Sequence, residues 1–187
     1  MGNSQPKRIE EFLIREILLI FGLVALALVQ VTLLPTPLGF PPALLLILAI
    51  CSLLVGIGEG ESHPESSVAA AIRWAFYGGI GLDLCSASPL GSHALALLLA
   101  VILVTLVTRH LRVEGEGLLL PILAVLLGML VYEGMLALLL YGPTLAQALA
   151  PIDWQRYAVV VFLPSILQAL IPTLPLFMLL RRLFRAR

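Results

Sequence analysis

The chain has 187 residues, of which 60% are hydrophobic and only 12% are charged, and its 11 basic side chains balance 11 acidic ones. Soluble domains carry about a quarter of charged residues, and a single core in a chain of this length cannot bury so much apolar surface. The composition therefore excludes an ordinary soluble domain and predicts an integral membrane protein. Without net charge or a basic patch interleaved with aromatic residues, the sequence gives no support to nucleic-acid binding.

Six apolar segments predict an all-α membrane domain with six transmembrane helices, because about 20 apolar residues cross the hydrocarbon core. The segments are expected at residues 17–34, 42–57, 68–84, 90–108, 118–141 and 157–180. Before them, residues 1–16 form a polar segment that is either a short interfacial helix or a frayed tail. A basic tail at 181–187 follows them. The prolines of the last segment, Pro164, Pro172 and Pro175, are expected to break it.

The distribution of basic residues predicts the orientation of these segments. With the N-terminus in the cytoplasm, the cytoplasmic pieces hold Lys7, Arg8, Arg15, Arg109, Arg112, Arg181, Arg182, Arg185 and Arg187. Only Arg156 falls in a loop on the other side, so the positive-inside rule predicts that both termini are cytoplasmic. The acidic loop 58–67 also falls inside, but acidic residues contribute little to this rule.

Three charged residues, Arg73, Asp83 and Glu133, fall within the apolar segments and need a reason, because ionisable groups are costly in a bilayer. At about 1.5 Å per residue, Asp83 and Glu133 both lie about 22 Å from the inner edge, near the outer side. Three interpretations stay open for them: a proton or cation site, caps on helix ends, or a cavity open to water. Arg73 lies near the inner edge, where its side chain can extend to the interface.

The stretch from Gly78 to Ala100 has the most distinctive pattern in the chain. It contains, in order, Gly78, Gly79, Gly81, Asp83, a turn from Ser86 to Gly91 that includes Pro89, and the alanines Ala96 and Ala100. These small residues predict close helix packing, either within the chain or against a partner. His93 lies in the first turn of the segment that follows and is expected to make a polar contact.

Motifs of enzymes and metal sites are missing from the sequence. It contains no G-x-S-x-G, H-E-x-x-H or Walker motif. Its two cysteines, Cys51 and Cys85, have no neighbouring Cys or His at metal spacing. The sequence therefore predicts a protein that is not an enzyme and holds no cofactor or metal.

The step Gly81-Leu82-Asp83, the turn with Pro89-Leu90-Gly91 and the alanine- and leucine-rich helix after it resemble the rod shape-determining protein MreD family of bacteria. The length and the number of segments also fit this family. One feature departs from it: the second segment opens with Pro41-Pro42-Ala43, where the family often has a proline followed by an acidic residue. The resemblance implies a six-helix bundle similar to the substrate-binding components of energy-coupling-factor vitamin transporters.

The resemblance also implies a function. It implies a membrane scaffold of the cell-elongation machinery that helps to organise peptidoglycan synthesis in the bacterial cytoplasmic (inner) membrane. The implied partners are the membrane-anchored shape protein MreC, the RodA glycosyltransferase with its transpeptidase, and the MreB filament. The residues expected to make structural or partner contacts are Gly78, Gly81, Asp83, Pro89, Gly91, Ala96 and Ala100.

An alternative function is that of the vitamin-transporter component itself, which would bind a small vitamin in a cavity open to the outside. The prolines of the last segment and the acids of the outer side fit this alternative. Such a pocket usually needs convergent polar and aromatic groups. The outer halves of the segments supply mainly Asp83, Glu133, Tyr132 and His93.

Overall fold

The computed structural model describes residues 5–32, 43–58, 64–86, 88–111, 119–146, 159 and 163–185. The helices in this part of the chain are α1 (Gln5–Thr32), α2 (Leu44–Gly58), α3 (Pro64–Cys85), α4 (Ser92–Leu111), α5 (Leu119–Ala146) and α7 (Leu163–Arg185). Five of these six helices contain apolar stretches of 19–21 residues, long enough to cross a bilayer, and α2 is shorter at 15 residues. The protein is a multi-pass helical membrane protein, as its composition predicts.

Local sequence explains where these helices begin and end. Leucine and alanine are strong helix formers, and a helix satisfies its own backbone hydrogen bonds where no water is available. Pro64 is the first residue of α3, a position at which its missing N–H group costs nothing. Gly91 lies directly before α4 with a φ of +96°, which favours glycine because it has no Cβ atom.

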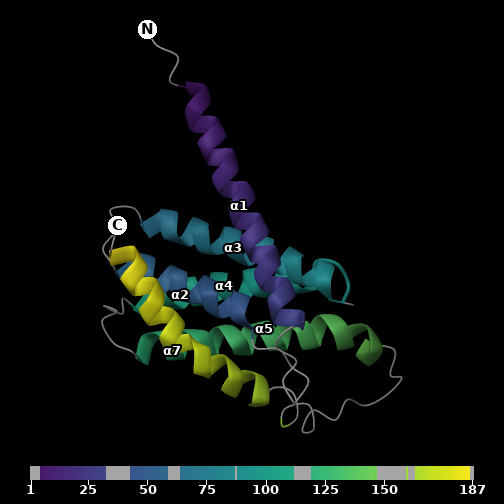
Figure 1. The fold of residues 1–187 in the computed structure, drawn as a ribbon. Helices are drawn as coiled ribbons and strands as arrows, with labels where there is room; N and C mark the ends of the chain where they lie inside the picture. Colours follow the sequence, from purple (N-terminus) through teal and green to yellow (C-terminus); the bar gives the residue numbers. More distant parts are fainter. Residues whose placement is uncertain are drawn as a thin grey trace.

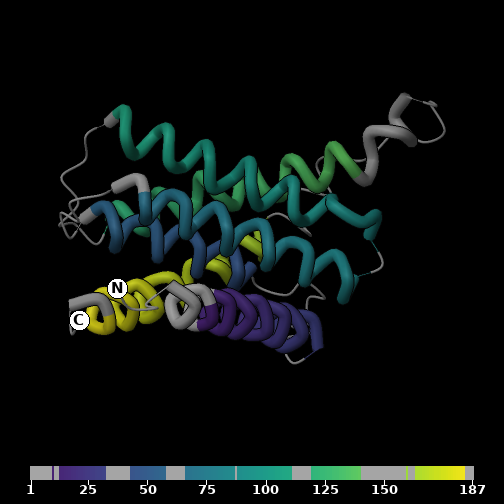
Figure 2. The backbone as a smooth tube through the Cα atoms, turned by 90° about the horizontal axis from the view of Figure 1, so that it is seen from above, coloured from purple at the N-terminus to yellow at the C-terminus, as the bar shows by residue number. Residues whose placement is uncertain are grey.

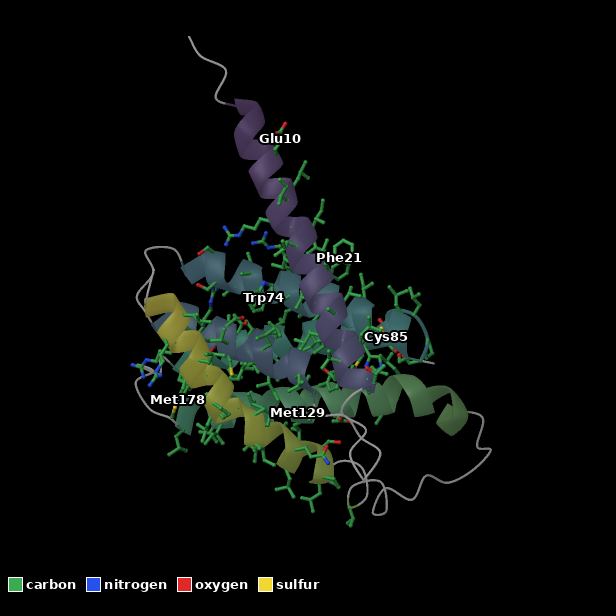
Figure 3. The ribbon with its side chains drawn as sticks, viewed as in Figure 1. Glu10, Phe21, Trp74, Cys85, Met129 and Met178 are labelled. Carbon is green, nitrogen blue, oxygen red and sulfur yellow. The ribbon has the colours of Figure 1, made fainter. Side chains whose placement is uncertain are left out.

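The short helix α2 lies in the centre of the bundle. Every residue from Leu45 to Val55 except Leu48 is buried, and α2 packs against each of the other five described helices. A helix surrounded by protein is apolar on every side, which is the pattern that α2 shows. Figure 1 shows α1 crossing the bundle at a steep angle, with its first half projecting beyond the other helices. In Figure 3, Glu10 marks this projecting part and Met129 lies within the bundle on α5.

Contacts of α3 fix the direction of its two neighbours. Helices α1 and α3 cross at a steep angle (Figure 1), but both advance toward the same end of the bundle. Glu16 pairs with Arg73 and, further along both helices, Val24 lies beside Gly81. Helix α2 runs opposite to α3, with Gly56 against Ser67 at one end and Leu45 against Gly78 at the other.

We name the end of the bundle that carries the α3–α4 turn the turn end, and the opposite end the far end. Cys85, the last residue of α3, marks the turn end in Figure 3. Helices α3, α4 and α5 alternate in direction, and α7 runs back to the far end beside α2. Figure 2 shows that the described start of α1 points away from the turn end, and that α7 also ends away from it.

The structure differs from the sequence-based expectations in two segments. Residues 5–16, for which two possibilities stayed open, continue α1 without a break. The expected break in the last segment is wrong: Pro172 and Pro175 lie inside one helix that runs from Leu163 to Arg185. Membrane helices tolerate prolines when hydroxyl groups and neighbouring helices satisfy the freed backbone groups. Helix α7 packs against α2 and α5, which are such neighbours.

Part of the predicted topology lies outside the described residues. Arg112, Arg156 and Arg187, which contribute to the predicted orientation, are not among them, and neither are residues 59–63 of the acidic loop.

Candidate functional site

Asp83 is the centre of a polar site at the turn end. It lies in the last turn of α3, and only 4% of its surface is exposed. Its carboxylate accepts hydrogen bonds from the backbone N–H groups of Gly91 at 2.9 Å, His93 at 2.9 Å and Ala94 at 3.2 Å. The hydroxyl of Ser92 donates a fourth hydrogen bond at 3.3 Å. Asp83 therefore caps the first turn of α4.

The cap has a clear physical cause. The first N–H groups of a helix have no partner within the helix, and unsatisfied backbone groups are costly in a membrane. The positive end of the helix dipole also stabilises a nearby carboxylate. Of the three interpretations that the sequence left open for Asp83, these contacts correspond to a helix cap.

Gln30 caps a second helix at the same end. It lies near the end of α1, is 3% exposed, and its Oε1 atom accepts a hydrogen bond of 3.3 Å from the N–H group of Leu45 in the first turn of α2. Gln30 is not among the site residues predicted from the sequence. The signal that could have drawn attention to it is a lone amide side chain near the end of an otherwise apolar segment.

His93 connects the polar site to α5. Its Nδ1 atom lies 2.8 Å from the hydroxyl of Tyr132, which is buried, and the two rings are tilted with centroids 6.1 Å apart. The polar contact that the sequence predicts for His93 is thus made with Tyr132. Together with the cap, it links α3, α4 and α5 at one level of the bundle.

Glu133 follows Tyr132 along α5 but takes no part in these contacts. Its side chain is half-buried, and no described residue forms a hydrogen bond or an ion pair with it. Successive residues of a helix point about 100° apart, so Glu133 lies on a different face of α5 from Tyr132. Asp83 and Glu133 share the turn end, yet no hydrogen bond joins them in the described part of the chain.

Arg73 lies away from the polar site, in the first half of α3. Its guanidinium nitrogen lies 2.5 Å from Oε1 of Glu16 on α1, and the two side chains are 46% and 19% exposed. The side chain of Arg73, which the sequence predicts to extend toward the interface, forms an ion pair with Glu16 and so links α1 to α3. Glu16 belongs to the polar segment predicted at the N-terminus and was not predicted as a partner of Arg73.

Glycines bring α3 close to its neighbours. A Cβ atom added at Gly79 would overlap the Cα atom and the backbone nitrogen of Ala94 on α4. Gly78 faces a flexible leucine side chain of α2, and Gly81 has ordinary van der Waals distances to α1. Gly79, which the sequence groups with Gly78 and Gly81 as residues of close helix packing, is therefore the glycine of α3 that can least accept a side chain.

The remaining predicted contact residues divide into buried and exposed ones. Ala96 and Ala100 are fully buried within the bundle. Pro89 is exposed in the turn, and its neighbour Gly91 is half-buried with its positive φ. Among the predicted contact residues, those in the turn are therefore the ones that another protein can reach.

Comparisons with known proteins give no match among family models, curated proteins or solved structures. The interpretation of the site therefore rests on its own geometry. Within the described residues, no group of three or more His, Cys, Asp or Glu side chains could hold a metal ion. What the arrangement does is structural: it closes the α3–α4 turn and fixes α4 against α5.

Proposed function

We propose that this chain is a non-enzymatic membrane scaffold of the bacterial cell-elongation (rod shape) machinery, located in the cytoplasmic (inner) membrane. In this role it binds a membrane-anchored, MreC-like shape protein. It works with a RodA-like glycosyltransferase and its transpeptidase and with the MreB filament to organise peptidoglycan synthesis. The starting point of the proposal is the resemblance of the stretch from Gly81 to Gly91 to the MreD family.

One contact supports this proposal most. Asp83, which closes the Gly81-Leu82-Asp83 step, accepts a hydrogen bond of 2.9 Å from the backbone N–H group of Gly91, which closes the turn. The stretch therefore builds one closed turn, and the side chains of Pro89 and Leu90 are exposed on it. A buried acid that holds an exposed turn in shape fits a protein that acts by assembly.

The transporter alternative receives less support. It relies on polar groups near the outer side that would surround a vitamin. Asp83 uses its oxygens to cap α4, and His93 is bonded to Tyr132. These groups bind one another, so they are poorly placed to bind a ligand.

Co-purification tests the proposal. The full chain is expressed with a tagged MreC-like protein from the same genome and solubilised in mild detergent. We expect the tagged protein to retain the chain, while an unrelated tagged protein with a single membrane span does not. Equal amounts retained by both, or retention of a vitamin instead of the partner, would contradict the scaffold function.

A further inference from the structure

We propose that the face of α5 around Glu133 and Gly134 receives a single membrane-spanning helix of another chain, which carries a lysine or arginine side chain at the level of Glu133. This inference rests on the proposed scaffold function and deepens it, because it assigns the surface that the anchored partner uses.

The first observation is an acid without a partner inside a membrane span. Glu133 lies in the span Leu119–Leu139, six residues before its end (139 minus 133), which places it about 9 Å inside. Its side chain is half-buried, and no described residue bonds to it. Acids in membrane helices usually pair with another group or face water, because a lone charge is costly there. A cation brought by a second helix would compensate this charge.

The levels of α5 and α7 can be matched through α2. A Cβ atom at Gly128 of α5 would overlap the side chain of Ile50 on α2. The next residue of α2, Cys51, directs its thiol toward the carbonyl oxygen of Thr173 on α7 at 4.0 Å. Gly128 and Thr173 therefore lie at one level of the bundle.

From that level, two acceptors lie equally far toward the turn end. Glu133 is five residues beyond Gly128 on α5, and Gln168 is five residues beyond Thr173 on α7, in helices that pack against each other. The side-chain oxygen of Gln168 is buried and has no donor in the described part of the chain. This level thus holds two acceptor groups that lack donors among the described residues, Glu133 at the surface of α5 and Gln168 within the bundle.

The surface beside Glu133 is open and carries a small residue between two exposed leucines. Gly134 is exposed, and a Cβ atom added there would meet nothing within 4 Å. Leu130 and Leu138, four residues to either side, are 55% and 63% exposed. Contact with lipid explains why Leu130 and Leu138 are exposed, but it does not explain why the small Gly134 lies beside the polar Glu133. A small residue beside a polar one is typical of helix–helix contacts in membranes, where apolar side chains gain little by leaving lipid.

A second copy of this chain does not fit the surface. The cation in the first half of α3, Arg73, is already paired with Glu16. The other basic residues in the described spans are Arg15, near the start of the span in α1, and Arg109, His110, Arg181 and Arg182, near the ends of α4 and α7. All of them lie toward the far end, away from the level of Glu133. Because the proposed function supplies a partner anchored by one membrane span, the spanning helix of that partner is the occupant that meets the charge of Glu133.

Site-specific photocrosslinking tests the surface. The full chain carries a photoreactive phenylalanine analogue at Leu130 or Leu138 and is expressed with the tagged MreC-like protein. Both positions are expected to crosslink to the spanning helix of that protein. The same analogue at Leu95, an exposed residue near the start of α4, serves as the matched control and should not crosslink. Crosslinks at Leu95 in place of those on α5 would overturn the assignment.

Charge reversal tests the role of the acid. Glu133→Lys should lower the amount of partner retained by about tenfold or more, because it places like charges together. Reversal of the partner's basic residue to Glu should restore retention. Glu10→Lys, at an exposed acid on the projecting part of α1, is the control and should leave retention unchanged. If Glu133→Lys does not fold, Gly134→Leu replaces it, because the space around Gly134 is open and the variant blocks only the approach of a helix.

The outcomes separate the surface from the function. If the wild-type chain does not retain the partner, the proposed function fails and the surface assignment falls with it. If the wild type retains the partner but Glu133→Lys and Gly134→Leu retain it equally well, only the surface assignment is overturned.

Discussion

Each oxygen of the Asp83 carboxylate accepts two hydrogen bonds. Oδ1 receives them from His93 and Ser92, and Oδ2 from Gly91 and Ala94. An ionised carboxylate suits this arrangement, because it offers acceptor sites on both oxygens and has no proton of its own. Shorter capping side chains with one hydroxyl cannot reach as many donors.

Replacement of Asp83 by Asn should therefore destabilise the protein. The amide –NH2 group would face backbone N–H donors in place of one oxygen, and the charge that favours the start of α4 would be lost. Because hydrogen bonds to charged groups contribute about 1.5–3 kcal/mol each, we expect a clear fall in the midpoint of thermal unfolding in detergent. Glu10→Gln, the same exchange at an exposed acid, is the control. Equal midpoints for both variants would contradict the role of Asp83 as a cap.

For single residues, the sequence predicted which side chains have a structural role more successfully than it predicted which groups they contact. Asp83 stood out because it interrupts an apolar segment, and a helix cap was one of its open interpretations. The backbone donors that it meets depend on the positive φ of Gly91, which places the first turn of α4 over the carboxylate. Gln30 was not predicted, because it caps α2 only after the chain has folded back between α1 and α2, and composition does not show how the chain folds back.

Close contact between α3 and α4 is the main feature at the scale of helices. Gly79 packs directly against the backbone of Ala94, and the N–H group of Ala94 also donates to the cap made by Asp83. Close approach of this kind increases the van der Waals contact on which membrane helices rely. The capped α3–α4 turn and the close packing at Gly79 therefore both hold α3 against α4.

Gly79→Ala should separate these helices. The added methyl group would overlap backbone atoms of Ala94, which cannot move as easily as the end of a side chain. Overpacking of this kind costs about 1–3 kcal/mol, measured as lower thermal stability in detergent. Gly81→Ala is the matched control on the same helix, because its nearest neighbour, the Cβ atom of Ala27, lies 3.4 Å away. If the two variants are equally stable, the close approach at Gly79 is not what holds α3 and α4 together.

The sequence could not distinguish these two glycines. Gly79 and Gly81 are two residues apart and point in different directions around α3, and their neighbours depend on how each helix is rotated about its axis. Composition predicts where a helix lies along the chain, which is why the expected segments overlap all six described helices. Rotation and neighbours are set by packing across the whole bundle, which apolar periodicity does not encode when a helix is apolar on every side.

The whole molecule is organised around the enclosed helix α2, with α1 as its outermost part. Helix α1 exposes Ile14, Leu18 and Phe21 along its length and is held to α3 by the ion pair of Glu16 with Arg73. These apolar side chains are accounted for by lipid, in which a membrane helix needs no protein cover. Helix α1 can therefore keep its steep crossing angle with a limited set of contacts to α2 and α3.

The directions of the helices lead to a prediction about the two ends of the chain. Although α1 is steeply inclined, it advances toward the turn end as α3 does, and α7 ends away from the turn end. The start of α1 and the end of α7 should therefore lie on one side of the membrane, opposite to the α3–α4 turn. Single cysteines introduced at Glu10, Leu90 and Arg182, all exposed, report this arrangement through a thiol reagent that does not cross membranes. The background carries Cys85→Ser, and the remaining Cys51 is buried.

In intact cells we expect the reagent to label position 90 and to spare positions 10 and 182, because the excess of arginine near both termini places them in the cytoplasm. Labelling of all three positions after the membrane is opened is the control for reactivity. The two parts of the expectation fail separately. If positions 10 and 182 are labelled from outside and position 90 is not, the arrangement of helices stands and the orientation is reversed. If positions 10 and 182 differ from each other, the chain does not cross the membrane as the bundle requires, and the directions of α1 and α7 relative to the turn are wrong.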